Sequence, residues 1–113
     1  MAGYDKGLGR QRVKDEAELD GHLNDLKAGE SLLGLWGVHT YTFFRDKGDS
    51  QIYIYDSWTP GDTIHLKGSD GYNKRVPDGL TQTESPMKII KGPRYDRSMF
   101  NEEIGPKHLQ LSH

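Results

Sequence analysis

Cysteine is absent from the 113 residues of this sequence. Within these residues there is therefore no disulfide, no thiolate nucleophile and no zinc site built on cysteine. Because cytosolic proteins seldom use disulfides, a cytoplasmic protein is the default expectation. Secretion as an effector without a classical signal peptide agrees equally well with the composition.

Long hydrophobic runs are also missing. No stretch approaches the roughly 20 apolar residues that a membrane-spanning helix needs, and the opening MAGYDKGLGR lacks the apolar segment of a signal peptide. The net charge is only −2, from 15 Lys and Arg against 17 Asp and Glu, so no overall field draws the protein to nucleic acid or anionic lipid. We expect no membrane partner, and we expect any contact with nucleic acid to be local.

Hydrophobic side chains make up only 33% of the sequence, which contains 14 glycines and 5 prolines. This composition predicts a modest core and many turns or irregular loops. The chain length suits one domain. Residues 1–12 are rich in glycine and basic residues and lack apolar periodicity, so they predict a mobile lead-in, followed by a single domain over residues 13–113.

One helix is indicated near the N-terminus. Leucines recur at i, i+4 and i+7 from Leu19, which places them on one helical face. Asp15 begins a pattern that resembles a capping pair, and Gly29 stands where a glycine commonly ends a helix. The pattern predicts a helix over residues 15–28.

The rest of the sequence favours short strands, which are rich in β-branched and aromatic residues. Turns with glycine, proline or aspartate separate them, such as TPGD, GSDG and VPDG. The tail DRSMFNEEIG predicts a short helix. The predicted fold class is α+β, with an N-terminal helix packed on a small antiparallel sheet. The expected strands are SLLGLW, VHTYTFF, QIYIYDSW, TIHLKG and MKIIKG.

The second and third of these strands predict a β-hairpin, and its turn decides whether His39 and Asp56 meet. With a four-residue loop over residues 46–49 they pair directly, with Cβ atoms about 4.5–5.5 Å apart. A three-residue loop with Gly48 in the left-handed conformation places Asp56 on the opposite face. We favour the four-residue loop because it sorts apolar side chains more cleanly. It gathers on one face Tyr41, Phe43, Ile52 and Ile54.

The order of these elements carries a family resemblance. A helix, the segment LKAGESLLGLWG, a strand that opens with His39 and a second strand ending in YDSW resemble the later half of papain-like cysteine peptidases. The likeness is to the bacteriocin-processing type and related bacterial toxin domains, and it covers residues 15–67. In that family the histidine opens a strand and the orienting aspartate ends the next. The resemblance implies that His39 and Asp56 are the catalytic dyad, with Ser57 and Trp58 beside them.

The family's nucleophilic cysteine lies upstream of this pair, and no cysteine occurs here. Peptidase activity of these residues alone is therefore not expected. The function that the resemblance implies is a non-catalytic protein-binding domain of a bacterial effector or its regulator. Its cleft around His39, Asp56 and Trp58 would engage a protein or peptide, and we expect no cofactor.

Aromatic residues provide further candidates for binding. Tryptophan is enriched in interface anchors and ligand clefts, which makes Trp36 and Trp58 candidate binding residues, although the core also needs large apolar side chains. Tyr53 and Tyr55 lie on the opposite face of their strand from the isoleucines. If no helix covers that face, both tyrosines and Phe44 form an exposed aromatic patch that marks a partner site.

Two other function classes stay open. A cluster of cations and aromatic residues, with His39 or His65 as general base, is typical of a small metal-independent ribonuclease toxin. A solvated basic edge is the simpler interpretation, and a structural interaction module is the third class. The histidines show no spacing of metal ligands, so we expect no metal. The cations concerned are Lys88, Lys91, Arg94 and Arg97.

Overall fold

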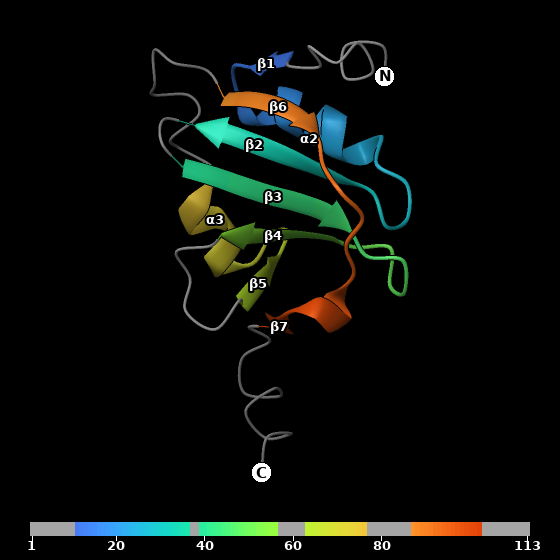
Figure 1. The fold of residues 1–113 in the computed structure, drawn as a ribbon. Helices are drawn as coiled ribbons and strands as arrows, with labels where there is room; N and C mark the ends of the chain where they lie inside the picture. Colours follow the sequence, from blue (N-terminus) through green and yellow to red (C-terminus); the bar gives the residue numbers. More distant parts are fainter. Residues whose placement is uncertain (1–10, 37–38, 57–62, 77–86, 103–113) are drawn as a thin grey trace.

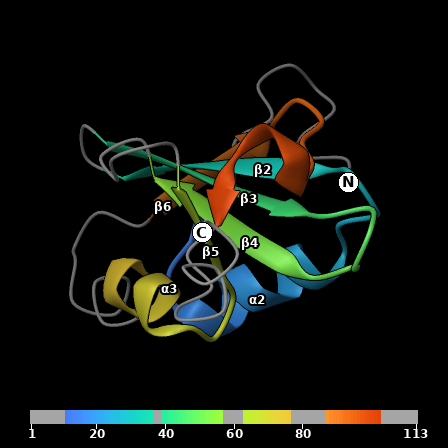
Figure 2. The same cartoon turned by 90° about the horizontal axis from the view of Figure 1, so that it is seen from below.

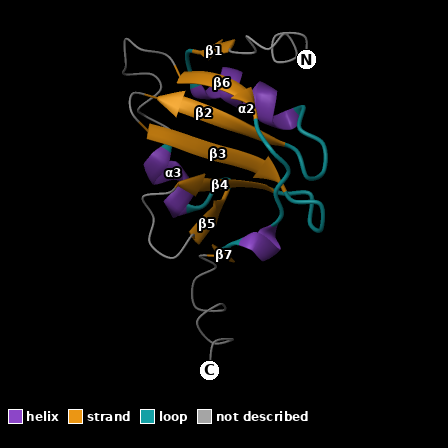
Figure 3. Ribbon diagram, viewed as in Figure 1, coloured by secondary structure: helices purple, strands orange, loops and turns teal. Residues whose placement is uncertain are grey.

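The computed structural model describes residues 11–36, 39–56, 63–76 and 87–102, which form a sheet with two helices and a short 3-10 turn (Figures 1 and 3). The strands follow the spatial order β1-β6-β2-β3-β4-β5-β7. Neighbours are antiparallel except for β7, which runs parallel to β5. The α+β class with an antiparallel sheet is thus confirmed. The strands are β1 (Gln11–Val13), β2 (Ser31–Trp36), β3 (His39–Arg45), β4 (Ile52–Asp56), β5 (Thr63–Leu66), β6 (Met87–Lys91) and β7 (Asn101–Glu102).

Helix α2 (Glu16–Asn24) is shorter than the sequence predicts. Its start agrees with the prediction, because the side chain of Asp15 accepts a hydrogen bond from the backbone N–H of Glu18 at 2.9 Å. Its end does not. Gly29 has the expected positive φ of 84°, but its N–H donates to the carbonyl of Arg45 at 2.7 Å. The glycine therefore shapes the turn into β2 and does not end the helix.

Helix α3 (Asp70–Arg75) occupies a segment in which the sequence predicts only a turn. The side chain of Ser69 caps its first turn by accepting from the N–H of Tyr72 at 3.2 Å. Asp70 lies in the first turn, and basic residues lie in the last, as the helix dipole favours. None of the helices in the described ranges is long and apolar enough to cross a membrane.

Strand β1 was not predicted either. Gln11 and Arg12, which composition alone assigns to the lead-in, pair with Ile89 and Lys88 of β6. The predicted helix of the tail is only the 3-10 turn η2 (Arg97–Met99), followed by β7. Strands β1 and β7 form the two edges of the sheet. Each is short, and each pairs with part of the outer backbone of its neighbour, β6 or β5.

Both helices lie on one face of the sheet, as the view from below shows (Figure 2). The main core lies on this face, where alternate residues of the strands meet the buried side chains of the helices. Phe43 lies at its centre, fully buried, with its ring 6.2 Å from that of Tyr72. The cluster consists of Val13, Leu19, Leu23, Leu26, Leu32, Tyr41, Phe43, Ile52, Ile54, Tyr72, Val76, Met87 and Ile89.

The opposite face carries a smaller aromatic core beneath residues 92–100, which we call the strap (Figure 2). The ring of Phe44 lies 5.5 Å from that of Phe100 and 5.9 Å from that of Tyr95. Phe44 and Tyr53 are consequently buried, and Tyr55 is half-buried. The predicted exposed aromatic patch is therefore wrong, because a segment from much later in the chain covers it.

Polar contacts fasten the strap to the turn between β3 and β4. The N–H of Arg97 donates to Asp46 at 2.8 Å, and its guanidinium donates to Asp49 at 2.5 Å. The hydroxyl of Tyr53 donates to the same oxygen of Asp49, also at 2.5 Å. Asp49 therefore joins the strap, the turn and the aromatic core.

This arrangement predicts a pH dependence of stability that involves Asp49. Burial alone would raise the pKa of Asp49, but hydrogen bonds from Tyr53, Gln51 and Arg97 outweigh it and lower the pKa. A carboxyl whose pKa is lower in the folded than in the unfolded state stabilises the protein at pH values above its unfolded-state pKa, about 4. This stabilisation is lost as the pH falls through the folded-state pKa.

We therefore expect the free energy of unfolding to fall more steeply in the wild type than in Asp49→Asn as the pH drops below about 4. Urea unfolding at a series of pH values measures both slopes. Parallel slopes in the two proteins would show that Asp49 has the same proton affinity in the folded and unfolded states.

Candidate functional site

The hairpin has neither of the two predicted turns. Tyr41 pairs with Asp56, and Arg45 pairs with Ile52, so residues 46–51 form the connection. The carboxylate of Asp46 accepts from the backbone N–H groups at 48 and 49, at 2.9 and 3.0 Å, and stabilises this wider turn. Both predicted registers are wrong, because each assumed a shorter loop than the observed connection over residues 46–51.

The register differs from the favoured prediction by two residues, and a shift of two leaves every side chain on its predicted face. His39 and Asp56 are therefore diagonal neighbours on the helix-covered face, not a direct pair. The structure brings them into contact, with His39 Nε2 2.5 Å from Asp56 Oδ1. His39 is 7% exposed and Asp56 is 5% exposed, so the pair is almost completely buried.

Arg75 of α3 is the partner that the sequence analysis missed. Its Nε donates to Asp56 Oδ2 at 3.1 Å, while its Nη1 donates to the carbonyl of Gly71 at 2.7 Å. Each oxygen of the carboxylate thus has its own partner, and the guanidinium compensates the buried charge. The role of Arg75 could have been predicted only together with α3, because this helix places Arg75 near the end of β4.

Two aromatic residues complete the site. The rings of His39 and Tyr41 meet edge to face, with centroids 4.5 Å apart at 82°. Trp36 pairs with His39 across β2 and β3, and its ring lies 6.3 Å from that of Tyr41. Burial, with a smaller contribution from the negative charge of Asp56, raises the pKa of Tyr41. We call these residues the dyad cluster: Trp36, His39, Tyr41, Asp56 and Arg75.

The chemistry of the dyad cluster follows from its hydrogen bonds. A carboxylate can only accept, so Asp56 fixes Nε2 of His39 as the donor and thereby sets the orientation of the imidazole. Such a pair can position a base for proton transfer, but covalent catalysis of the cysteine type also requires a thiol. The sequence contains no cysteine. Within these residues the cluster therefore has no thiol that could form a thioester with a substrate.

Of the predicted binding residues in the described ranges, only Trp36 belongs to the dyad cluster, where it is half-buried and packs against the main core. Tyr53 and Tyr55 lie on the opposite face, with the aromatic core beneath the strap. Ser57 and Trp58 lie outside the described residues.

The cations proposed for a nuclease are separated from the histidines. Lys88 lies on the opposite face from His39, as the register of β6, β2 and β3 requires. His65 is 2% exposed and lies in β5, four strand spacings from β6, or about 19 Å. The remaining cations contact the protein itself: Lys91 with Glu30 at 3.8 Å, Arg94 with the carbonyl of Ala28 at 2.8 Å, and Arg97 with Asp49.

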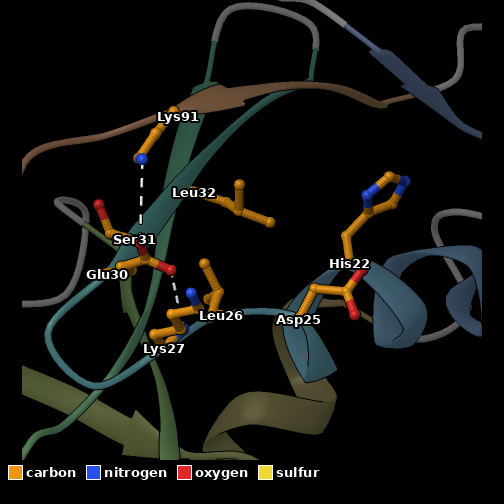
Figure 4. A pocket seen from close by; sticks show the side chains of 8 residues that line it. All are labelled: His22, Asp25, Leu26, Lys27, Glu30, Ser31, Leu32 and Lys91. Carbon is orange, nitrogen blue, oxygen red and sulfur yellow. Dashed lines mark hydrogen bonds and ion pairs between the residues drawn. The ribbon is translucent and has the colours of Figure 1, made fainter. Parts of the chain in front are cut away.

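A separate pocket of about 470 Å³ lies between the end of α2 and the strands β2 and β6 (Figure 4). Its ion pair joins Lys91 to Glu30, and the N–H of Lys27 donates to Glu30 at 2.8 Å. This backbone hydrogen bond is the main cause of the lowered pKa of Glu30. Among the described residues no group of three or more His, Asp or Glu side chains is placed to hold a metal ion. The pocket is lined by His22, Asp25, Leu26, Lys27, Glu30, Ser31, Leu32 and Lys91.

Comparisons of the chain with protein families, with curated proteins and with solved structures found no match.

Proposed function

We propose that this chain is a non-catalytic protein-binding domain related to papain-like cysteine peptidases, and that it binds an extended peptide segment beside the dyad cluster. One observation carries the proposal: the first residue of β3 and the last residue of β4 meet as a buried hydrogen-bonded His39–Asp56 pair. The family resemblance implies a histidine and an aspartate at these positions.

The surroundings of the pair support a positioning role. A buried carboxylate costs free energy unless it is compensated, and Asp56 is compensated by both His39 and Arg75. In this proposal the N-terminal helix α2 packs on the same face of the sheet through Leu19 and Leu23, and it helps to hold the strands that carry the pair.

Trp36 is the residue of the dyad cluster most suited to anchor a peptide. It is the last residue of β2, it is half-buried, and it lies directly across from His39. A tryptophan with one apolar face on the core and another toward solvent is a common hot spot in protein interfaces. The ribonuclease alternative is not favoured, because the histidines and the basic residues lie apart.

Selection of random linear peptides displayed on phage tests this function. Peptides that bind the wild type should bind Trp36→Leu at least about tenfold more weakly, since the loss of a hot spot costs more than 1 kcal/mol. Leucine at this position keeps an apolar contact with the core. The matched control is Met99→Ser, because Met99 is 57% exposed in η2 on the other face and should leave the affinity unchanged.

Two results would contradict the proposal. One is a selection in which no peptide is enriched. The other is a set of enriched peptides that bind Trp36→Leu as tightly as they bind the wild type.

A further inference from the structure

The two faces of the sheet are covered unequally over β2 and β6. On the helix side, Leu32 is 2% exposed and Ile89 is fully buried. On the other side, the alternate residues of the same strands are only half-buried, beyond the aromatic core that the strap covers. We call these residues the aliphatic strip: Leu33, Leu35 and Ile90.

The aliphatic strip is continuous across the two strands. Leu33 pairs directly with Ile90, and Leu35 is the next residue of β2 on the same face. Thr40, which pairs with Leu35, is exposed and continues the surface onto β3, whereas Thr42, which pairs with Leu33, is buried and marks the limit of the surface. A row of half-buried aliphatic side chains on one face of the sheet provides apolar area for a partner.

Two cations border the strip. Lys88 pairs with Leu35 on one side and with Arg12 of β1 on the other, so two like charges lie opposite each other on this face. Directly opposed like charges destabilise a sheet. None of the residues of β1, β2, β3 and β6 is Asp or Glu, and no ion pair among the described residues involves Arg12 or Lys88.

We infer that this face binds an acidic amphipathic helix of a partner protein. The apolar side of that helix would cover the aliphatic strip, and its carboxylates would pair with Arg12 and Lys88. An anionic partner removes the repulsion between the two cations, which gives the complex a stabilisation that the free chain lacks. Aliphatic side chains favour apolar side chains of a polypeptide over nucleic-acid bases, which stack on aromatic rings.

The surface is distinct from the dyad cluster, which lies on the opposite face of the sheet, so failure of one proposal leaves the other standing. The probe is a synthetic peptide of about 14 residues with leucines along one helical stripe and glutamates beside it. A control peptide has lysine in place of every glutamate. Binding is followed by the backbone amide signals of the full chain in NMR spectra.

The acidic peptide should shift the signals of Leu33, Leu35 and Ile90, and it should bind at least about tenfold more tightly than the basic peptide. The double variant Arg12→Glu, Lys88→Glu should reverse this preference. Both side chains are at the surface, and the unchanged amide signals of the main core will confirm that the variant folds.

Three results would overturn the inference. The wild type could bind both peptides equally, the acidic peptide could shift signals only elsewhere, or the charge reversal could leave the preference unchanged. Vesicles that contain phosphatidylserine and a single-stranded oligouridine are tested in parallel. If either of them shifts the strip and the acidic peptide does not, the surface serves membrane or nucleic acid instead.

Discussion

Replacing Asp56 with alanine should lower the free energy of unfolding by about 3–5 kcal/mol, the usual cost of breaking a buried charge pair by removing one partner. Asp56 is 5% exposed, and its two oxygens contact His39 at 2.5 Å and Arg75 at 3.1 Å. Alanine removes the carboxylate that accepts from both the guanidinium and the imidazole. It also leaves a space at the end of β4.

Asp56→Asn is the matched control. Asparagine keeps the shape of the side chain and one carbonyl oxygen, so a hydrogen bond to His39 or Arg75 survives while the charge is lost. Its destabilisation should be smaller, about 1–3 kcal/mol. Urea unfolding at neutral pH measures both variants. Equal stabilities of Asp56→Ala and the wild type would show that the pair contributes nothing to the fold.

The second large effect is expected at Gly34, where alanine should lower the free energy of unfolding by about 1–3 kcal/mol through overpacking. Gly34 pairs with Tyr41 of the dyad cluster on one side and with Ile89 on the other. A Cβ there would lie 2.6 Å from Sδ of Met87 and 3.1 Å from Cε2 of Phe43. Both neighbours are fully buried, so the core must shift to accept the methyl group.

Gly21→Ala is the matched substitution, and it should raise the free energy of unfolding. Gly21 lies in the interior of α2, and a Cβ at this position would meet nothing within 4 Å. Alanine in an exposed helix is more stable than glycine by about 1 kcal/mol. Thermal unfolding compares the two variants. A stabilising Gly34→Ala would show that the core beside the dyad cluster is looser than the described packing.

Local patterns in the sequence were sufficient to predict the main strands and the start of α2. Short runs of apolar, β-branched or aromatic residues between turn residues mark β2 to β6, and Asp15 marks the helix cap. The predicted end of α2 was wrong, because Gly29 belongs to the turn before β2, where its N–H donates to the carbonyl of Arg45 in β3. Such a contact has no local signature.

The site was predictable only in part. The face of His39 and Asp56 follows from alternation, and it survives an error of two residues in the register. The register itself depends on the side chain of Asp46, which closes a wider turn. Arg75 could not be assigned without α3, and the burial of Tyr53 depends on the strap, residues 92–100, which follows much later in the chain.

The most direct test of the dyad cluster is an NMR spectrum of the histidine ring nitrogens, recorded with and without a peptide from the selection. The structure predicts that Nε2 of His39 carries a proton, because Asp56 can only accept, and that this proton signal changes in Asp56→Asn. Added peptide should shift the ring signals of His39 and leave those of His22, which lines the separate pocket, unchanged. An unprotonated Nε2 in the wild type, or a peptide that shifts His22 and not His39, would contradict the account.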